Sequence, residues 1–342
     1  MARDRFRHSL AVIASEVGAT KGSHILRTKI LGRSRIMILC YHRITETNGI
    51  MGPQCVSPRN FENHVRHFHS VCDVWPLVKI SDFLEGRCKP KRDTVILTFD
   101  DGYMDNYEEA LPILNRYGIP ATFFVTTGPI LTGRPHWIDV LASVLDRIAS
   151  GYDGSRFDMG AHMAVQFARF RQSKQRRQRE IGIEILDHLK SLKEDVRNQI
   201  VTTLYSRYEI SDRTTVTDGR RMMSVEQILS LVAQGHEVGA HSVSHPMLAQ
   251  LDEKRCREEI HNSINCLESI GVPVSSFAYP FGGEDDIGEA TTRILGETAV
   301  RIGVTTERRK LRMDDNPLRV PRMVVSDTEL PRLVAGIERH SW

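Results

Sequence analysis

The sequence has no apolar stretch that could cross a membrane and no regular cysteine framework. No window approaches the roughly 18 apolar residues of a membrane-spanning helix. The six cysteines include no C-x-x-C pair, and a disulfide scaffold is not expected in a chain of 342 residues. The net charge is only +3, so composition does not predict nucleic-acid binding. The length allows one large α/β domain with an insertion, or two domains.

The first 30 residues are predicted to form a basic helical segment at the edge of the fold. Their apolar stretch from Leu10 to Ala14 is interrupted by Ser15 and Glu16, and no A-x-A cleavage site follows it. We therefore expect no secretory signal and a cytoplasmic location. Because a basic amphipathic helix can lie on a lipid surface, peripheral contact with a membrane stays open.

Apolar runs alternate with helical patterns through most of the remaining chain, which predicts parallel βα units. Strands are expected at residues 35–42, 94–99, 120–127, 236–240, 275–282, 299–306 and 318–325. Helices are expected at residues 57–68, 106–119, 224–235 and 252–271. About seven such units predict a distorted (β/α) barrel over residues 31–342, closed or nearly closed, whose strand C-termini converge on one face.

Residues from about 130 to 223 break this alternation and are predicted to form a mainly helical insertion that shapes or covers the substrate side. The stretch is rich in charge, and residues 168–192 are its longest helical piece. Its basic run RFRQSKQRRQR, residues 169–179, is typical of a solvated helix face; contact with an acidic membrane or an anionic saccharide is the alternative.

Two short polar motifs stand at the ends of predicted strands. TFDDGY, residues 98–103, contains Asp100 and Asp101, and HSVSH, residues 241–245, contains His241 and His245. Two imidazoles and a carboxylate can hold a divalent metal and leave positions open for water and substrate, which is typical of a catalytic site. Zn²⁺ is the favoured ion, and Co²⁺, Mn²⁺ or Fe²⁺ would also suit these ligands.

The adjacent aspartates have a use in such a site. Successive side chains of an extended chain point to opposite sides, so Asp101 can ligate the metal while Asp100 accepts the proton of the attacking water. The cation would also offset the repulsion between the two carboxylates. The alternatives are an ordinary Asp-Asp-Gly turn after a strand and a chance pairing of two histidines.

These motifs resemble those of the polysaccharide deacetylases, the NodB-homology family of carbohydrate esterases (family 4). TFDDG and H-[ST]-x-x-H match the first two motifs of that family, and FAYPFG, residues 277–282, is similar to the third. The resemblance covers roughly residues 36–125 and 224–325. It implies that Asp100 is the general base, that Asp101, His241 and His245 hold the metal, and that a metal-bound water is the nucleophile.

The third motif implies that Tyr279 and Phe281 face the oxyanion or the substrate, with the backbone N–H of Phe281 helping to stabilise the oxyanion. The implied reaction is the metal-dependent hydrolytic deacetylation of N-acetylhexosamine units in a polysaccharide or oligosaccharide. The expected partner is therefore an N-acetylated saccharide.

Three departures from the family pattern are visible. The third motif lacks its usual Arg, for which Arg322 is the candidate substitute; an ordinary ion-pair arginine is the alternative. The family's C-terminal L-x-x-H, whose His is the general acid, is not found in the C-terminal strand, but LCYH at residues 39–42 offers His42 on the first strand for that role; a buried histidine hydrogen-bonded within the strand is the alternative. In a closed barrel the first and last strands are neighbours, so the order resembles the permuted poly-N-acetylglucosamine deacetylases. The Asp-Trp motif is not recognisable.

Two other functions stay open at this point. The same metal site could hydrolyse another amide or ester, which a survey of acetylated substrates would distinguish. A carbohydrate-binding relative that has lost catalysis is the second alternative, and it would gain support if His42 lay far from Asp101.

Overall fold

The computed structural model describes residues 34–46, 49, 54–151, 161–208 and 220–340. The predicted helical segment at residues 1–30 lies outside this part of the chain. None of the described helices is long and apolar enough to cross a membrane. All six cysteines are described, and none is in a disulfide.

Seven parallel strands form a curled sheet in the order β10-β1-β5-β6-β7-β8-β9. They are β1 (Ile36–Tyr41), β5 (Thr94–Phe99), β6 (Ala121–Val125), β7 (Glu237–Ala240), β8 (Ser276–Ala278), β9 (Ile302–Val304) and β10 (Met323–Val324). Three short strands lie off this path: β2 (Arg43–Ile44), β3 (Cys55–Val56) and β4 (Asp73–Val74), the last paired with β5.

The sheet curls until its two edges meet. β10 pairs with β1 through Leu39 and Met323, and the chain just before β10 forms a parallel bridge from Val320 to Val304 of β9. The segment at residues 320–324 therefore joins β1 to β9, and the predicted distorted (β/α) barrel of about seven strands is confirmed.

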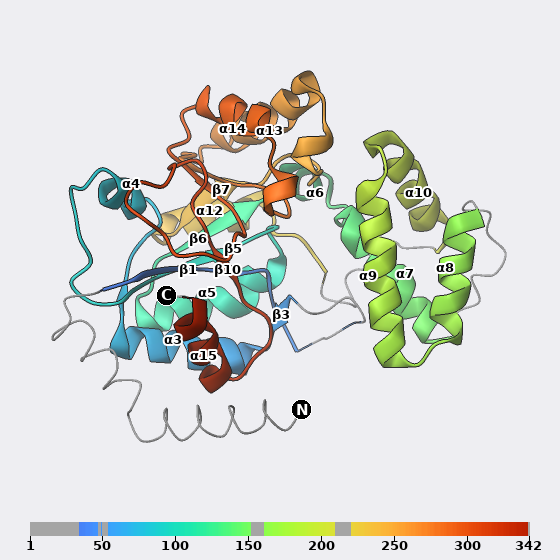
Figure 1. Cartoon of the computed structure of the whole chain (residues 1–342), viewed down its shortest axis with the longest axis horizontal. Helices are drawn as coiled ribbons and strands as arrows, with labels where there is room; N and C mark the ends of the chain where they lie inside the picture. Colours follow the sequence, from blue (N-terminus) through green and yellow to red (C-terminus); the bar gives the residue numbers. More distant parts are fainter. Residues whose placement is uncertain (1–33, 47–48, 50–53, 152–160, 209–219, 341–342) are drawn as a thin grey trace.

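Helices surround the sheet (Figure 1). They are α3 (Pro58–Val71), α4 (Lys79–Leu84), the π-helix η2 (Asn106–Ala110), α5 (Leu111–Tyr117), α12 (Val225–Ala233), α13 (Glu253–Ser269), α14 (Glu289–Gly296) and α15 (Leu330–His340). Short 3₁₀ turns are η3 (Leu248–Gln250) and η4 (Glu284–Asp286). A capping box formed by Ser224 and Gln227 begins α12.

Between β6 and α12, the described part of the chain contains α6 (Thr127–Thr132), α7 (Trp137–Ala149), α8 (Ala161–Gln172), α9 (Gln175–Ser191) and α10 (Glu194–Arg207). Figure 1 shows α7 to α10 as a lobe beside the sheet, with α9 on the side nearer to it. The lobe has its own apolar core, which includes Leu141, Phe170 and Ile185. The single helix predicted over residues 168–192 is wrong, because Lys174 is extended (ψ 157°) and separates α8 from α9.

Aromatic packing fills the barrel beneath the strand ends. The rings of Tyr41, Phe99 and Phe123 stack across β1, β5 and β6, with centroids 5.5 and 4.8 Å apart. The Tyr41 hydroxyl lies 3.3 Å from Nδ1 of the buried His64, whose Nε2 lies 2.8 Å from the carbonyl oxygen of Thr328. Dense packing of this kind fixes the backbone from which the polar motifs project.

Candidate functional site

Asp101, His241 and His245 come together where β5 and β7 end. The Nε2 atom of each histidine lies 3.4 Å from Oδ1 of Asp101. One donor atom from each of the three residues lies within 4.8 Å of the others, and all three side chains are buried. The fold therefore assembles the predicted ligand set from motifs that are 140 residues apart in the chain, from Asp101 to His241.

The backbone at this site is strained. Among the described residues, the non-glycine positions with left-handed φ are Asp101 (78°), Ser242 (63°), His245 (58°) and Phe281 (61°). Each such conformation costs about 1–3 kcal/mol and persists only where its surroundings enforce it. All four lie in the three motifs singled out from the sequence, which is the distribution expected of a functional site.

Glu259 of α13 holds the histidine loop in place. Its carboxylate accepts hydrogen bonds from the N–H groups of Val243 (2.8 Å) and Ser244 (2.9 Å) and from the Ser244 hydroxyl (2.7 Å). Sequence reasoning missed Glu259. Its signal was a carboxylate on the apolar face of a predicted helix, between Cys256 and Ile260, where a charge needs partners.

The pKa values of the two histidines are shifted in opposite directions. Nδ1 of His241 lies 2.7 Å from the carbonyl oxygen of Ala278, a contact that places the proton on Nδ1 and turns Nε2 toward Asp101. Burial lowers the pKa of His241, but hydrogen bonding to Asp101 and the charge of Asp100 outweigh it and raise the pKa. Burial and the neighbouring His241 hold the pKa of His245 well below its ordinary value.

These residues fit a divalent cation. Burial would raise the pKa of Asp101, but the nearby histidines, His241 first, lower it well below its ordinary value. The site therefore offers an ionised carboxylate and two imidazole nitrogens in a buried pocket, a donor set that Zn²⁺ and similar ions prefer.

Arg322 holds Asp100. Its guanidinium donates two hydrogen bonds of 2.7 Å to the two carboxylate oxygens, and others to Thr98 Oγ1 (3.0 Å) and the carbonyl oxygen of Thr305 (3.1 Å). Burial would raise the pKa of Asp100, but Arg322 and His241 lower it from 3.8 to about 2. The pair is thus a buried, bidentate ion pair that keeps Asp100 ionised and fixes its orientation.

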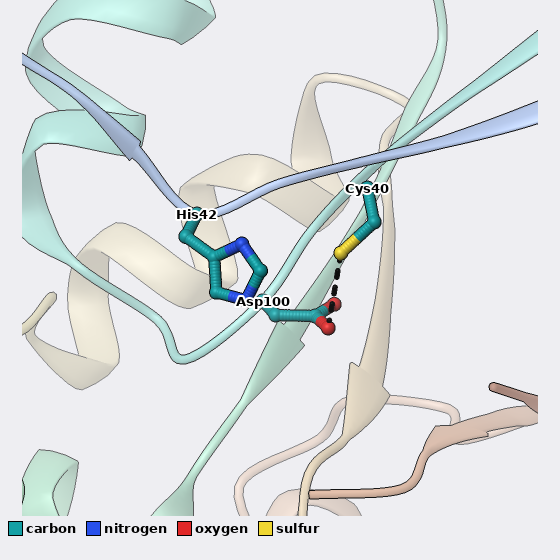
Figure 2. Close-up of side chains that lie close together, drawn as sticks. All are labelled: Cys40, His42 and Asp100. Carbon is teal, nitrogen blue, oxygen red and sulfur yellow. Dashed lines mark hydrogen bonds between the residues drawn. The ribbon is translucent and has the colours of Figure 1, made fainter. Parts of the chain in front are cut away.

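Cys40 and His42 approach the same carboxylate from β1. The Cys40 thiol donates to Oδ2 of Asp100 at 3.3 Å, and the His42 ring lies beside it (Figure 2). Burial raises the pKa of the Cys40 thiol well above its ordinary value, so it stays a donor. Asn106 of the π-helix donates to the His42 carbonyl oxygen at 2.7 Å. Sequence reasoning missed Cys40. Its signal was its position two residues before His42, since side chains two apart on a strand point to the same face.

A cavity of about 280 Å³ opens over these groups. Its lining includes His42, Asp100, Asp101, His241, His245 and Phe281. The ring of Phe281 lies 4.7 Å from that of His245, measured between centroids, and the Phe281 N–H donates no hydrogen bond within the described residues.

Tyr279 is the predicted site residue that the structure sets apart. It is 1% exposed, its hydroxyl donates to the carbonyl oxygen of Leu318 at 2.8 Å, and it does not line the cavity. Its backbone continues the sheet by donating to Val304, so its ring packs into the core against Phe277. The turn into left-handed φ comes at Phe281, which alone of the two aromatics reaches the cavity.

The family model described as polysaccharide deacetylase matches residues 87–300. The chain belongs to the polysaccharide deacetylase family. The Bacillus subtilis (strain 168) protein YxkH is 36% identical over 93 residues, which span 27% of this chain and 32% of YxkH. The poly-beta-1,6-N-acetyl-D-glucosamine N-deacetylase of Staphylococcus aureus (strain MSSA476) is 27% identical over 118 residues, 31% of this chain and 41% of that protein.

The matched segments thus span about a third to two fifths of these curated relatives. The fold likeness extends further. The structure of Streptococcus pyogenes deacetylase PplD in complex with acetate aligns with a TM-score of 0.57 and 18% identity over 90% of this chain and 98% of that one. Homologues of the chain are polysaccharide N-deacetylases, hydrolases that act on carbon–nitrogen bonds outside peptides.

Two of the departures noted from the sequence, His42 and Arg322, lie at or next to the cavity. The first and last strands are neighbours, as expected, because β1 pairs with β10. His42, at the end of β1, lines the cavity with Asp101, and Arg322, just before β10, binds Asp100. A His42 far from Asp101 would have favoured a non-catalytic relative. The two residues instead line the same cavity.

Proposed function

We propose that the chain is a metal-dependent deacetylase that hydrolyses the N-acetyl groups of N-acetylhexosamine units in a polysaccharide or oligosaccharide. The observation that carries the proposal is an ionised Asp100, fixed by Arg322, beside the buried Asp101, His241 and His245 in one cavity. Membership of the polysaccharide deacetylase family and the named activity of the Staphylococcus aureus relative support the same reaction.

Asp101, His241 and His245 would hold the metal, for which we propose Zn²⁺ first and Co²⁺, Mn²⁺ or Fe²⁺ as alternatives. When bound, the ion supplies Lewis acidity toward the acetyl carbonyl and lowers the pKa of a water molecule. The three ligands hold their positions through the Ala278 carbonyl, the Glu259 carboxylate and the strained turns described above.

Asp100 and His42 then carry out the two proton transfers of the reaction. Asp100 accepts a proton from the attacking water, and its bidentate contact with Arg322 keeps one face of the carboxylate aligned. The N–H of Phe281 donates to the developing oxyanion. His42 donates a proton to the leaving amine as the C–N bond breaks, so that amide and water give acetate and a free amine.

The helical lobe has a proposed place in this scheme. We propose one barrel over residues 31–342, with the insertion at about 130–223 covering the substrate side, because Ile138 of α7 and several residues of α9 line the catalytic cavity. The cytoplasmic location, with or without peripheral membrane contact, stays a prediction.

A second candidate keeps the site and changes the substrate. Hydrolysis of another amide or ester uses the same base and ligands, and the curated relatives match over less than half of their length. A panel of acetylated glycolipids, esters and non-sugar amides would distinguish the two candidates by which compound releases acetate.

The test is acetate release from an N-acetylglucosamine oligomer by the purified full chain, with a chelator and then with added Zn²⁺ or Co²⁺. We expect release that the chelator abolishes and the ion restores. Release that persists in chelator would contradict the metal site. If no ion gave acetate release although bound metal was detected, the second candidate function would be favoured.

A further inference from the structure

One face of α9 forms a wall of the catalytic cavity. Arg179, Ile183, Leu186 and Lys190 all line it, together with Asp100 and the metal ligands. Their spacings of four, three and four residues place them on one side of the helix. α9 is on the side of the lobe nearer to the sheet (Figure 1). Substrate bound at the reaction centre would therefore also meet this face.

The two cations of this face differ from their neighbours on the lobe. Arg177 pairs with Glu180 and Glu184, and Arg169 also reaches Glu184. Arg179 has no such carboxylate partner in the described part of the chain. Asp286 also lines the cavity, away from the metal ligands. Its carboxylate accepts a hydrogen bond from the Gly283 N–H at 2.9 Å.

Lys190 stands next to the reaction centre. Its Nζ lies 3.9 Å from the centroid of the Phe281 ring, which in turn contacts the His245 ring. Arg179 lies eleven positions earlier, three helical turns or about 16 Å along the axis. Between them, Ile183 and Leu186 present apolar surface, and Ile183 is 42% exposed. The wall is thus an elongated strip with a cation at each end.

We propose that this strip is a subsite for a saccharide that carries negative charge on sugars flanking the N-acetylated one. The proposal rests on the deacetylase function above and names its substrate class. The planar guanidinium of Arg179 matches a carboxylate or a phosphate with two parallel hydrogen bonds. The apolar middle of the strip contacts the C–H faces of sugar rings. Lys190 attracts an anionic substituent close to the sugar that reacts.

The experiment measures binding rather than turnover. Asp100→Asn protein, as the full chain with Zn²⁺ added, is titrated calorimetrically with two tetrasaccharides of equal length. One is the neutral N-acetylglucosamine tetramer, and the other alternates N-acetylglucosamine with glucuronate. A third probe, the neutral tetramer with a terminal phosphate, distinguishes carboxylate from phosphate as the preferred anion.

We expect a charged tetramer to bind about three- to tenfold more tightly than the neutral one, as one or two charge-assisted contacts provide. Arg179→Gln and Lys190→Gln should each remove much of this preference and leave the neutral tetramer unaffected. The matched control is Arg177→Gln, on the opposite side of the same helix, which should keep the preference. Added salt should weaken only the charged probes.

Equal affinity for neutral and charged tetramers, or loss of the preference in Arg177→Gln, would overturn the subsite. The outcome is independent of the proposed reaction. Acetate release from the neutral oligomer without any charge preference would remove the subsite and keep the deacetylase. Charge-selective binding without acetate release from any probe by the unmutated chain would keep the subsite and remove the reaction.

Discussion

The barrel end and the facing helix α9 line one cavity but are built differently. At the barrel end the polar groups are buried, Asp100 is held by Arg322 and His241 by the Ala278 carbonyl, and the backbone is strained at Asp101, His245 and Phe281. On α9, Arg179 and Ile183 are exposed on a regular helix without strain. A reaction requires fixed geometry, whereas a preference for one saccharide requires only a suitable surface. We infer that the barrel carries the chemistry and α9 the selectivity.

The largest effect expected on the barrel side comes from Asp100→Asn. A neutral amide cannot accept the water's proton, so the rate should fall by about 10²–10⁴-fold, as for loss of a general base. The metal content should stay unchanged, because Asp101 and both histidines remain. Kinetics and metal analysis on the same preparation check this. Near-normal turnover with bound metal would contradict the role of Asp100.

Arg322→Lys should give the next largest effect. Lysine cannot form the two parallel bonds to Asp100 and also reach Thr98 and the Thr305 carbonyl. We expect kcat to fall about 10- to 100-fold, with the folded state destabilised by about 1–3 kcal/mol. Kinetics and urea unfolding measure the two effects. Arg319→Lys, at a partly exposed position that does not contact Asp100, is the matched control and should change neither by a comparable amount.

The barrel's buried His64 predicts a pH effect on stability rather than on rate. Burial lowers its pKa from 6.5 to about 4, so the unfolded state binds a proton between these values and the folded state does not. Stability from this residue is present above pH 6.5 and is lost as the pH falls toward 4, by about 2 kcal/mol between pH 7 and pH 5. Urea unfolding at both pH values should show a smaller loss in His64→Gln. An equal loss in both proteins would contradict the prediction.

The smallest effect is expected on the α9 side. Ile183→Ser removes apolar surface from the cavity wall, so KM should rise about two- to fivefold, or about 0.5–1 kcal/mol, with kcat unchanged. Val165→Ser, at an exposed position on α8 outside the cavity lining, is the control and should change neither constant. A fall in kcat for Ile183→Ser would contradict the proposal that α9 affects only substrate selectivity.

The same division explains what the sequence could predict. The strands and the polar motifs at their ends are local patterns, so the barrel and the meeting of Asp101 with His241 and His245 followed from apolar runs and motif spacing. Cys40 and His42 share one face of β1 by simple alternation. The motif letters did not separate Tyr279 from Phe281: the backbone of Tyr279 continues the sheet, whereas the left-handed turn comes at Phe281, and no motif letter records a φ angle.

Contacts between distant segments were harder to predict. The bond from Arg322 to Asp100 joins residues 222 positions apart, and only closure of the barrel places them together. The break at Lys174, which divides one expected helix into α8 and α9, has no proline or glycine to mark it. Which face of α9 meets the cavity depends on how the lobe packs, and the periodicity of the helix alone does not determine this.

Closure of the ring by the segment at residues 320–324 has a consequence for biosynthesis. As the polypeptide leaves the ribosome, His42 and both aspartates are made early, and Arg322 is the last of the proposed catalytic groups to appear. Until then Asp100 lacks its buried counter-charge and the seam between β9 and β1 is open. A nascent chain that stops short of this segment would hold every metal ligand and still lack an aligned base, so catalysis would begin only once the barrel is sealed.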